Sequence, residues 1–246
     1  MELLSQSKSK LFASLLHKKY RYKHRLFIAE GAKCVKEAIL SDAEVIALVI
    51  QEGGTPLAAI PASVPLFQAS AEQFGKLTDQ PNPEGIMAVL QMPEHSIVGV
   101  EKEAGILLDG LQDPGNVGAI MRVADWFGIR QMIAGPGTVD LFHPKVVRAS
   151  MGSIFRMKIN ILPELSSFMN QYHERLVLAD LRGTSLRDAS IPKNGILIIG
   201  NEANGSSEIF TEDSRVRKIR IPGGDTTESL NAAVAAGIMI WEWKKS

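Results

Sequence analysis

The stretch LLDGLQDPGNVGAIMRVADWFGI, residues 107–129, runs from an apolar segment through a Pro-Gly-Asn turn into a helical pattern. Ile120, Val123, Ala124 and Phe127 fall at positions i, i+3, i+4 and i+7, which places them on one face of a helix. An apolar strand that passes through a tight turn into a half-buried helix is typical of α/β folds. This stretch therefore predicts one strand-helix unit of a parallel sheet.

The second half of the chain repeats this alternation of apolar strands and helical patterns. Strands are expected at 105–109, 131–134, 176–179, 195–199 and 218–221, and helices near 117–127 and 145–151. Such alternation favours a parallel sheet covered by helices, in which loops at the carboxyl ends of the strands hold ligands. The predicted fold class is therefore α/β, with the candidate site in those loops.

The segment QMPEHSIVGVEKEA, residues 91–104, has turn residues and charges without a sustained apolar period, so it separates two domains. The N-terminal part alternates helical stretches with short β-rich ones, at 32–40, 45–50, 71–77 and 85–90. We predict a small α/β domain at 1–92, a linker at 93–103 and the parallel-sheet domain at 104–246.

Composition places the chain among ordinary globular proteins, with 45% hydrophobic and 22% charged residues in a length of 246. No apolar run is long enough to span a membrane, and the first segment is too polar for a signal peptide, so we expect a cytoplasmic protein. Cys34 is the single cysteine, and the five histidines lack metal-ligand spacing, so neither a disulfide nor a bound metal is expected.

The formal net charge is zero, but the first forty residues carry nine Lys or Arg against three Glu. Tyr20, Tyr22 and Phe27 are interleaved with these cations, and aromatic rings can stack on unpaired bases while cations bind phosphates. A solvated helix face is the alternative explanation of the charge. The candidate RNA-binding residues are Lys18, Lys19, Arg21, Lys23 and Arg25.

In the loop of 107–129, Asn116 stands at the helix entrance and Arg122 lies off the apolar face. An arginine just past a strand-to-helix turn can bind phosphate or polarise a substrate oxygen. Two structural alternatives stay open at this point: Asn116 could be the helix N-cap, and Arg122 could form a surface ion pair with Asp125.

A second loop follows the apolar strand in GILIIGNEANGSSEIF, residues 195–210, before a helix expected near 206 or 207. Gly200 and Gly205 flank Glu202, so the backbone can approach a ligand closely there. The loop is not a phosphate-binding P-loop, because no Gly-Lys-Ser/Thr follows. GPGTVD at 135–140 lacks the third glycine of the dinucleotide fingerprint.

A third loop lies in KIRIPGGDTTESLNAAVAAGIMIWEW, residues 218–243, which leads from a strand into an alanine-rich helix. The small residues allow another helix to approach closely, as at a dimer interface or a compact crossing within the fold. Ser229 and Asn231 stand at the helix entrance, where capping explains either residue taken alone.

Together, DPGNVGAIMRVADWFG, HPKVVRASMGSIF, IIGNEANG and IP…ESLNAAVAAGI resemble the motifs of the SpoU/TrmH family of the SPOUT superfamily, across roughly residues 104–246. KHRLFIAEGAKCVKEAI, within residues 1–92, resembles the family's ribosomal-protein-like substrate-binding domain. The resemblance implies a C-terminal segment threaded into a trefoil knot and a homodimer whose sites are built from both subunits. It also implies transfer of a methyl group from S-adenosylmethionine to a ribose 2′-hydroxyl of RNA.

The resemblance carries the family's site residues onto matching positions of this chain. The implied catalytic residues are Asn116, Arg122, Glu202, Ser229 and Asn231. The implied cofactor-binding residues, acting mainly through their backbone, are Gly200, Asn201, Ile221, Pro222 and Leu230. Gly223 and Asp225 depart from the family, which usually has Met and Gly there, and Asn204 is also unusual; these changes bear on cofactor affinity.

A guanidinium stays protonated at neutral pH and is a poor base, so we expect Arg122 to stabilise charge on the 2′-hydroxyl and bind the adjacent phosphate. Ser229 and Asn231 would orient the hydroxyl, and Glu202 would position Arg122. The separate N-terminal domain favours ribosomal RNA over transfer RNA. A transfer-RNA enzyme, an RNA-binding factor without catalysis and a base or protein methyltransferase of another SPOUT branch remain alternatives.

Overall fold

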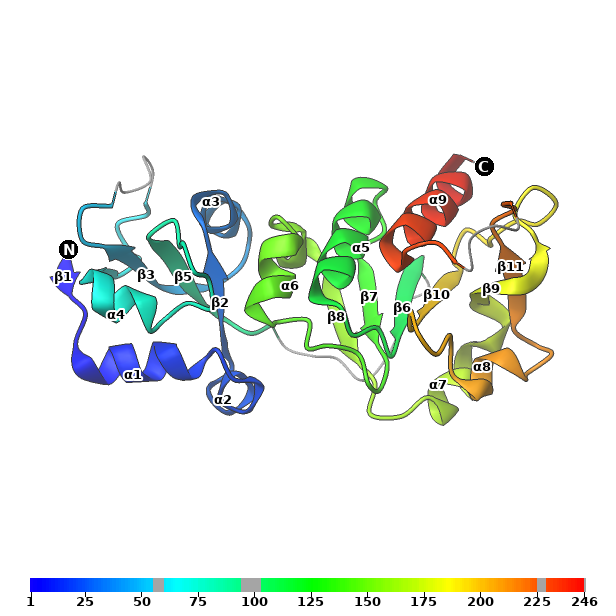
Figure 1. Cartoon of the computed structure of the whole chain (residues 1–246), viewed down its shortest axis with the longest axis horizontal. Helices are drawn as coiled ribbons and strands as arrows, with labels where there is room; N and C mark the ends of the chain where they lie inside the picture. The colour runs from blue at the N-terminus through cyan, green and yellow to red at the C-terminus, as the bar shows by residue number, and fades with distance from the viewer. Residues whose placement is uncertain (55–59, 94–102, 225–228, 246) are drawn as a thin grey trace. The chain divides into compact units, whose positions relative to one another are not determined.

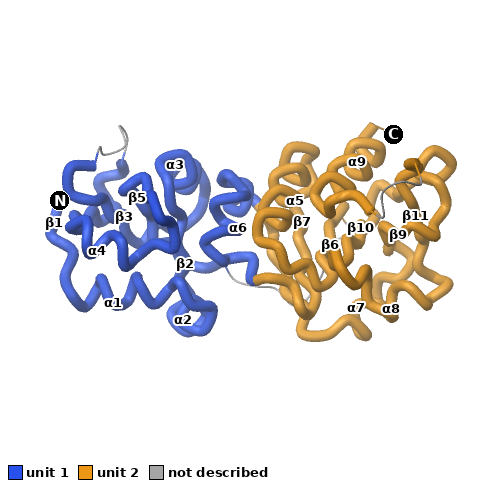
Figure 2. The backbone as a smooth tube through the Cα atoms, in the orientation of Figure 1, with its two compact units in different colours: residues 1–94, 140–156 blue, residues 95–139, 157–246 orange. Residues whose placement is uncertain are grey.

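The computed structural model describes residues 1–54, 60–93, 103–224 and 229–245 (Figure 1). The predicted linker at 93–103 and Asp225 therefore lie largely or wholly outside the described residues. The chain divides by its contacts into two compact units: Met1–Glu94 with Asp140–Arg156, and His95–Val139 with Met157–Ser246 (Figure 2). No helix of the described parts is long and apolar enough to cross a membrane, and no acidic, histidine or cysteine cluster there could hold a metal ion.

Unit 1 contains a mixed five-stranded sheet in the order β1-β4-β3-β5-β2, in which β5 runs antiparallel to β2 and β3. Its strands are β1 (Glu2–Leu3), β2 (Leu26–Glu30), β3 (Val45–Gln51), β4 (Leu66–Ala69) and β5 (Ile86–Gln91). Its helices are α1 (Gln6–Ser14), α2 (Lys18–His24), α3 (Ala32–Leu40), α4 (Ala71–Gly75), α6 (Pro144–Ala149) and a 3₁₀ turn at Ser153–Arg156. The helices and strands expected from periodicity in this part are all present, within two residues at the ends.

Residues 140–156 group with unit 1, whereas the sequence analysis placed them in the second domain. Phe142 packs on Phe27 with ring centroids 5.0 Å apart. Arg148 bridges Glu30 at 3.2 Å and Asp79 at 2.8 Å. The grouping follows from apolar contacts and charge complementarity between segments far apart in the chain, which a local sequence pattern does not reveal.

Arg21 is buried, with 1% of its surface exposed. Its Nε donates to Asp140 Oδ2 at 2.9 Å, and its Nη1 donates to the carbonyl oxygens of Leu15 at 2.8 Å and Leu16 at 2.9 Å. The Tyr22 hydroxyl donates to Asp140 Oδ1 at 3.0 Å. Burial is the main cause that raises the pKa of this phenol, and the neighbouring Asp140 carboxylate raises it further. The interpretation of Arg21 as an RNA contact is therefore wrong, because its guanidinium is buried and each of its three nitrogens is hydrogen-bonded inside unit 1.

Unit 2 contains a six-stranded sheet in which all neighbouring strands are parallel, in the order β11-β9-β10-β6-β7-β8. Its strands are β6 (Gly105–Asp109), β7 (Gln131–Ala134), β8 (Lys158–Ile161), β9 (Leu176–Ser185), β10 (Ile196–Gly200) and β11 (Arg217–Arg220). Its helices are α5 (Pro114–Trp126), α7 (Ser166–Tyr172), a 3₁₀ turn at His173–Arg175, α8 (Glu208–Thr211) and α9 (Ala232–Lys245). The predicted α/β class with a parallel sheet is confirmed.

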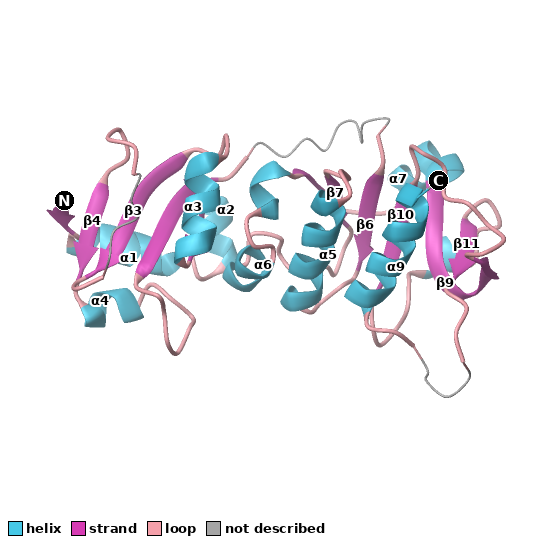
Figure 3. Cartoon of the chain, turned by 90° about the horizontal axis from the view of Figure 1, so that it is seen from above, coloured by secondary structure: helices cyan, strands magenta, loops and turns pink. Residues whose placement is uncertain are grey.

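Both faces of this sheet are covered. Alternate residues of the central strands pack with α7 and α8, in a core cluster of Leu107, Ile133, Leu178, Ile196, Ile198, Phe168, Met169 and Phe210. The residues between them, such as Ile106 and Leu197, are equally buried beneath α5 and α9, which pack against each other (Figure 3). Burial on both faces explains why these strands read as continuous apolar runs in the sequence.

Strand β10 lies between β6 and β9, although β9 precedes it in the chain, so the chain crosses back into the sheet. The loops that follow β6, β10 and β11 consequently emerge at one edge of the parallel sheet. The knot implied by the resemblance stays a prediction, because residues 225–228, which precede α9, lie outside the described residues.

Replacing Asp140 tests the buried pair of unit 1. Asp140→Leu leaves the Arg21 guanidinium buried without its counter-charge, so we expect the free energy of unfolding to fall by about 3–5 kcal/mol. The double variant Arg21→Met with Asp140→Leu should recover a large part of that loss, because it removes both charges. Urea denaturation of the three proteins measures this, and a single variant as stable as the unmodified chain would contradict the assignment.

Candidate functional site

The candidate site lies where the loops after β6, β10 and β11 meet in unit 2. Asn231 Nδ2 donates to Asn116 Oδ1 at 2.9 Å. Asn116 Nδ2 in turn donates to Glu202 Oε1 at 2.7 Å. The structure thus joins three of the five predicted catalytic side chains, one from each loop motif, in a single hydrogen-bonded chain. Glu202 and Asn231 are exposed, so this chain is open to a ligand from solvent.

Asp113, which the sequence analysis did not single out, is the N-cap of α5. Its Oδ1 accepts a hydrogen bond from the Asn116 backbone N–H at 2.7 Å, and Pro114 occupies the first helical turn. Asn116 is therefore not the cap, which leaves its amide free to bind Glu202 and Asn231. The order Asp-Pro at a strand-to-helix turn carries this information, because Asp is a preferred cap and Pro a preferred first helical residue.

Asn231 both caps a helix and belongs to the site. Its Oδ1 accepts from the backbone N–H groups of Ala233 at 2.9 Å and Val234 at 3.2 Å, at the start of α9. Its Nδ2 meanwhile donates to Asn116. The capping interpretation is thus correct for Asn231, and it coexists with a place in the site. Ser229 is exposed beside this entrance and has no hydrogen bond to any described residue.

Arg122 lies on α5 beyond Asn116 and is exposed. Its guanidinium makes no ion pair or hydrogen bond with the described parts of the chain. The alternative pair with Asp125 is not formed; the Asp125 carboxylate lies 4.0 Å from Arg130 Nε. The hypothesis that Glu202 positions Arg122 also differs from the structure, in which the Glu202 carboxylate accepts from Asn116. Within the described ranges, Arg122 is therefore an exposed cation without a partner.

The loop after β10 is shaped by the side chain of Asn201. Its Oδ1 accepts from the backbone N–H groups of Ala203 at 2.9 Å and Asn204 at 3.0 Å, and its Nδ2 donates to Gly110 O at 2.7 Å. The backbone of Asn201 also pairs with that of Gly205 in both directions. The side chain and the backbone of Asn201 therefore both hold the loop in its conformation.

Gly200 precedes this loop at the end of β10. A Cβ added there would lie 2.3 Å from Ser206 Oγ and 2.7 Å from Ser206 N. No side chain fits in that space unless the loop moves. Glycine at this position therefore lets the strand end and the returning loop pack backbone against backbone.

Asp109 is a further residue that the sequence analysis missed. It ends β6 with 2% of its surface exposed, and it accepts from Ser207 N at 2.6 Å and Ser207 Oγ at 2.7 Å. Thr138 adds a second link, because its Oγ1 donates to Leu108 O at 2.7 Å and accepts from Gly110 N at 3.1 Å. These bonds hold the loops after β6, β7 and β10 together. The only sign of them in the sequence is that the apolar strand β6 ends in an acidic residue.

The predicted cofactor-binding backbone lies in the same region. The backbone groups of Ile221 and Leu230 form no hydrogen bond with the described residues, so they are available to a ligand. Among the described residues, no atom lies within 4 Å of a Cβ added to Gly223 or Gly224, so this part of the loop is not packed against them. Main-chain donors and acceptors without partners among the described residues fit the adenosine group that the resemblance implies. Pro222, between Ile221 and Gly223 in the chain, is half-buried.

The remaining predicted RNA contacts lie in unit 1. Lys18, Lys19 and Lys23 on α2 are exposed, as is Arg25, which ends that helix with φ 53°. Arg25 Nη2 donates to Pro93 O at 3.0 Å. These four cations, unlike Arg21, are open to solvent.

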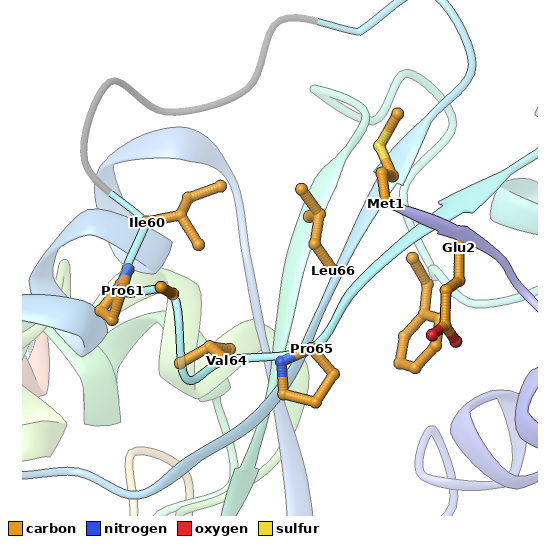
Figure 4. A pocket seen from close by; sticks show the side chains of 9 residues that line it. Met1, Glu2, Ile60, Pro61, Val64, Pro65 and Leu66 are labelled. Carbon is orange, nitrogen blue, oxygen red and sulfur yellow. The ribbon is translucent and has the colours of Figure 1, made fainter.

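Unit 1 also has a cavity of about 400 Å³, lined mainly by apolar side chains around Met1, Pro61, Val64 and Leu66 (Figure 4). Its lining includes none of the predicted site residues and a single carboxylate, that of Glu2. Cys34 is no nucleophile either, because burial raises the pKa of its thiol to about 12 and keeps it protonated. The polar chain of unit 2 is therefore the stronger candidate for a reaction site.

Comparison with known proteins agrees with this assignment. Residues 103–241 match the model of the SpoU rRNA Methylase family, and residues 7–88 match the MRM3-like substrate binding domain. The chain is 30% identical to the 23S rRNA (guanosine(2553)-2′-O)-methyltransferase RlmP of Bacillus subtilis, over 98% of this chain and 97% of that protein.

Two of the solved structures that match over nearly the whole length illustrate the similarity. One, from Porphyromonas gingivalis and assigned to the TrmH family, has a TM-score of 0.85 and 34% identity, with 99% of both chains covered. The other is an rRNA methyltransferase from Sinorhizobium meliloti with AdoMet bound. It has a TM-score of 0.84 and 26% identity, and the match covers 100% of this chain and 97% of that one.

Proposed function

This chain belongs to the SpoU rRNA methylase family, and from that membership we propose that it transfers a methyl group from S-adenosylmethionine to a ribose 2′-hydroxyl of ribosomal RNA. The observation that carries the proposal is the hydrogen-bonded chain Asn231-Asn116-Glu202, together with an exposed Arg122 that has no partner among the described residues. Ribosomal RNA is favoured because the full-length relative from Bacillus subtilis is named for that substrate. We place the reaction in the cytoplasm.

The cofactor supplies an electrophilic methyl group on a sulfonium ion. The backbone near Gly200, Ile221 and Leu230 would hold its adenosine portion, and the carboxylate of Glu202 contributes negative charge to the same edge of the sheet. The hydrogen bonds of Asp109 and Asn201 keep the loop after β10 in one conformation, so the loop loses little conformational entropy when the cofactor binds.

The protein's own contribution to the reaction is alignment and stabilisation of charge. Glu202 fixes the amide of Asn116, and Asn116 fixes the amide of Asn231 at the entrance of α9. Ser229 and Asn231 orient the 2′-hydroxyl. The guanidinium of Arg122 binds the adjacent phosphate and stabilises negative charge on the attacking oxygen, because its fork of N–H donors matches both groups.

We further propose that the chain works as a homodimer joined through α5 and α9. The apolar side chains Val234, Ile238 and Trp241 are 51%, 38% and 57% exposed on one stripe of α9, and Trp126 on α5 is 84% exposed. Gly237 lies on the same stripe, with no atom within 4 Å of an added Cβ. A second helix could therefore approach closely and cover these rings, as small residues at helix contacts allow.

The same interface would bring Arg122 to the site of the other subunit. Arg122 is one helical turn from Trp126 on α5, and it has no partner among the described residues of its own chain. Sites shared between two subunits are what the family resemblance implies. If Arg122 acts in the site of the other subunit, its exposure in its own chain is explained.

Arg122 variants test the reaction. Arg122→Ala should lower turnover about a hundredfold or more, because it removes charge stabilisation of the reacting oxygen. Arg122→Lys should also be strongly impaired, since an ammonium cannot bind two oxygens in the same plane. The measurement is transfer of label from S-adenosylmethionine to unmodified ribosomal RNA, followed by digestion to nucleosides and identification of 2′-O-methyl products.

Arg130→Ala is the matched control, because Arg130 is an exposed arginine in the same unit with its own partner in Asp125. Near-normal turnover by Arg122→Lys would contradict the role given to the guanidinium. Label in a base instead of a ribose would overturn the proposed reaction. Absence of label together with absence of S-adenosylmethionine binding in calorimetry would indicate an RNA-binding factor without catalysis.

The interface is tested with Ile238→Glu, which places a charge in the centre of the apolar stripe. We expect light scattering to give the mass of one chain for this variant and of two chains for the unmodified protein, with methyl transfer lost together with the dimer. Gln171→Glu, at an exposed position of α7, on the opposite face of the sheet from α9, should change neither property. A monomeric unmodified protein, or a fully active monomeric variant, would contradict a shared site.

A further inference from the structure

The exposed side of α2 carries a row of three rings. His17, Tyr20 and His24 follow the i, i+3, i+7 spacing of a helix, with His17 at the N-cap. The ring centroids of His17 and Tyr20 are 6.5 Å apart, and those of Tyr20 and His24 are 6.3 Å apart with planes inclined by 15°. All three residues are exposed, so the row borders solvent.

The neighbouring aromatic residues of the same segment have structural partners, which sets Tyr20 apart. Phe27 is 2% exposed and packs on Phe142, and the Tyr22 hydroxyl donates to Asp140. Tyr20 is 36% exposed, and its ring contacts are with the two histidines of the row. Packing of unit 1 thus accounts for Tyr22 and Phe27, and it leaves Tyr20 and its two histidines at the surface.

Cations surround this row, and α2 itself contains no acidic residue. Lys18, Lys19 and Lys23 are exposed, and Lys19 Nζ lies 6.0 Å from the centre of the Tyr20 ring. Exposed rings next to lysines that can bind the connecting phosphates are the combination by which proteins bind unpaired nucleotides.

The buried side of α2 makes the row rigid. Arg21 bonds at the same time to Asp140 and to the carbonyl oxygens of Leu15 and Leu16, so it fixes the helix to the end of α1 and to the segment 140–156. A surface that is already ordered loses little conformational entropy on binding. One helix therefore combines an anchored inner side with an outer side of rings and charges.

We propose that His17, Tyr20 and His24, with Lys18, Lys19 and Lys23, form a stacking surface for unpaired bases of RNA. The proposal rests on the proposed function for the identity of the nucleic acid as RNA. It adds that this unit recognises nucleotides of loops, bulges or single strands, through ring faces in addition to phosphates. Duplex RNA, whose bases are stacked on each other, would contact the lysines alone.

The test uses a short single-stranded RNA that carries 2-aminopurine, whose fluorescence reports stacking, and the full-length protein. Tyr20→Ala should weaken binding about five- to a hundredfold and abolish the fluorescence change, while Tyr20→Phe should bind as the unmodified protein does. Tyr20→Leu should behave as Tyr20→Ala, since it keeps apolar volume without a ring. Because Tyr20 is exposed, the thermal unfolding midpoint of each variant should stay close to that of the unmodified chain.

The dependence of RNA affinity on salt concentration distinguishes the contribution of the rings from that of the lysine charges. Lys19→Ala or Lys23→Ala should reduce the slope of log affinity against log salt by about one, whereas Tyr20→Ala should lower affinity without changing the slope. Lys76→Ala, at an exposed lysine of unit 1 paired with Glu72, is the control and should change neither. On fully paired RNA the Tyr20 variants should bind like the unmodified protein.

Full affinity of Tyr20→Ala or Tyr20→Leu for the single strand would overturn the stacking surface. If the unmodified protein methylates RNA while these variants bind normally, the surface is wrong and the proposed reaction stands. If the unmodified protein binds and stacks the RNA without any methyl transfer, the surface stands and the reaction is wrong. Failure to bind unpaired RNA at all would contradict the surface directly.

Discussion

The amide of Asn116 is the interaction on which the candidate site depends. Its Oδ1 and Nδ2 face Asn231 and Glu202, which belong to loops 115 and 86 residues away in the chain. The parallel sheet brings these loops to one edge, and the Asp113 cap leaves the amide free to join them. A single side chain therefore joins the loops after three strands in one polar surface, while Arg122 on the same helix has no partner among the residues that the structure describes.

In both units a buried carboxylate accepts hydrogen bonds that anchor a segment, a helix in unit 1 and a loop in unit 2. In unit 1, Asp140 holds Arg21 and Tyr22, which anchors α2. In unit 2, Asp109 holds Ser207, which anchors the loop after β10. A buried carboxylate with its donors in place restricts a segment to one conformation, because every alternative leaves the charge unsatisfied. Each unit thereby holds its exposed candidate site residues on a rigid support.

Much of the fold could be predicted because the strands of unit 2 are buried on both faces and the helices have apolar stripes. Asn116, Glu202 and Asn231 could be identified only through the order of three motifs, since each residue taken alone has a simpler explanation. Asp109 and the burial of Arg21 could not be foreseen, because their partners are 98 and 119 residues away and no local periodicity reports such pairs. In the sequence, Arg21 cannot be distinguished from the other cations of the basic segment. Only its contact with Asp140 in the fold shows that it is buried.

The central claim is that Asn116 holds the three loops as one cofactor site, and calorimetry with S-adenosylmethionine tests it most directly. Asn116→Ala removes both hydrogen bonds, so the account predicts binding weaker by about tenfold to a hundredfold, with the fold retained. Gln112→Ala, at an exposed position of the loop after β6, is the control and should bind as the unmodified chain does. Unchanged affinity in Asn116→Ala would contradict the account.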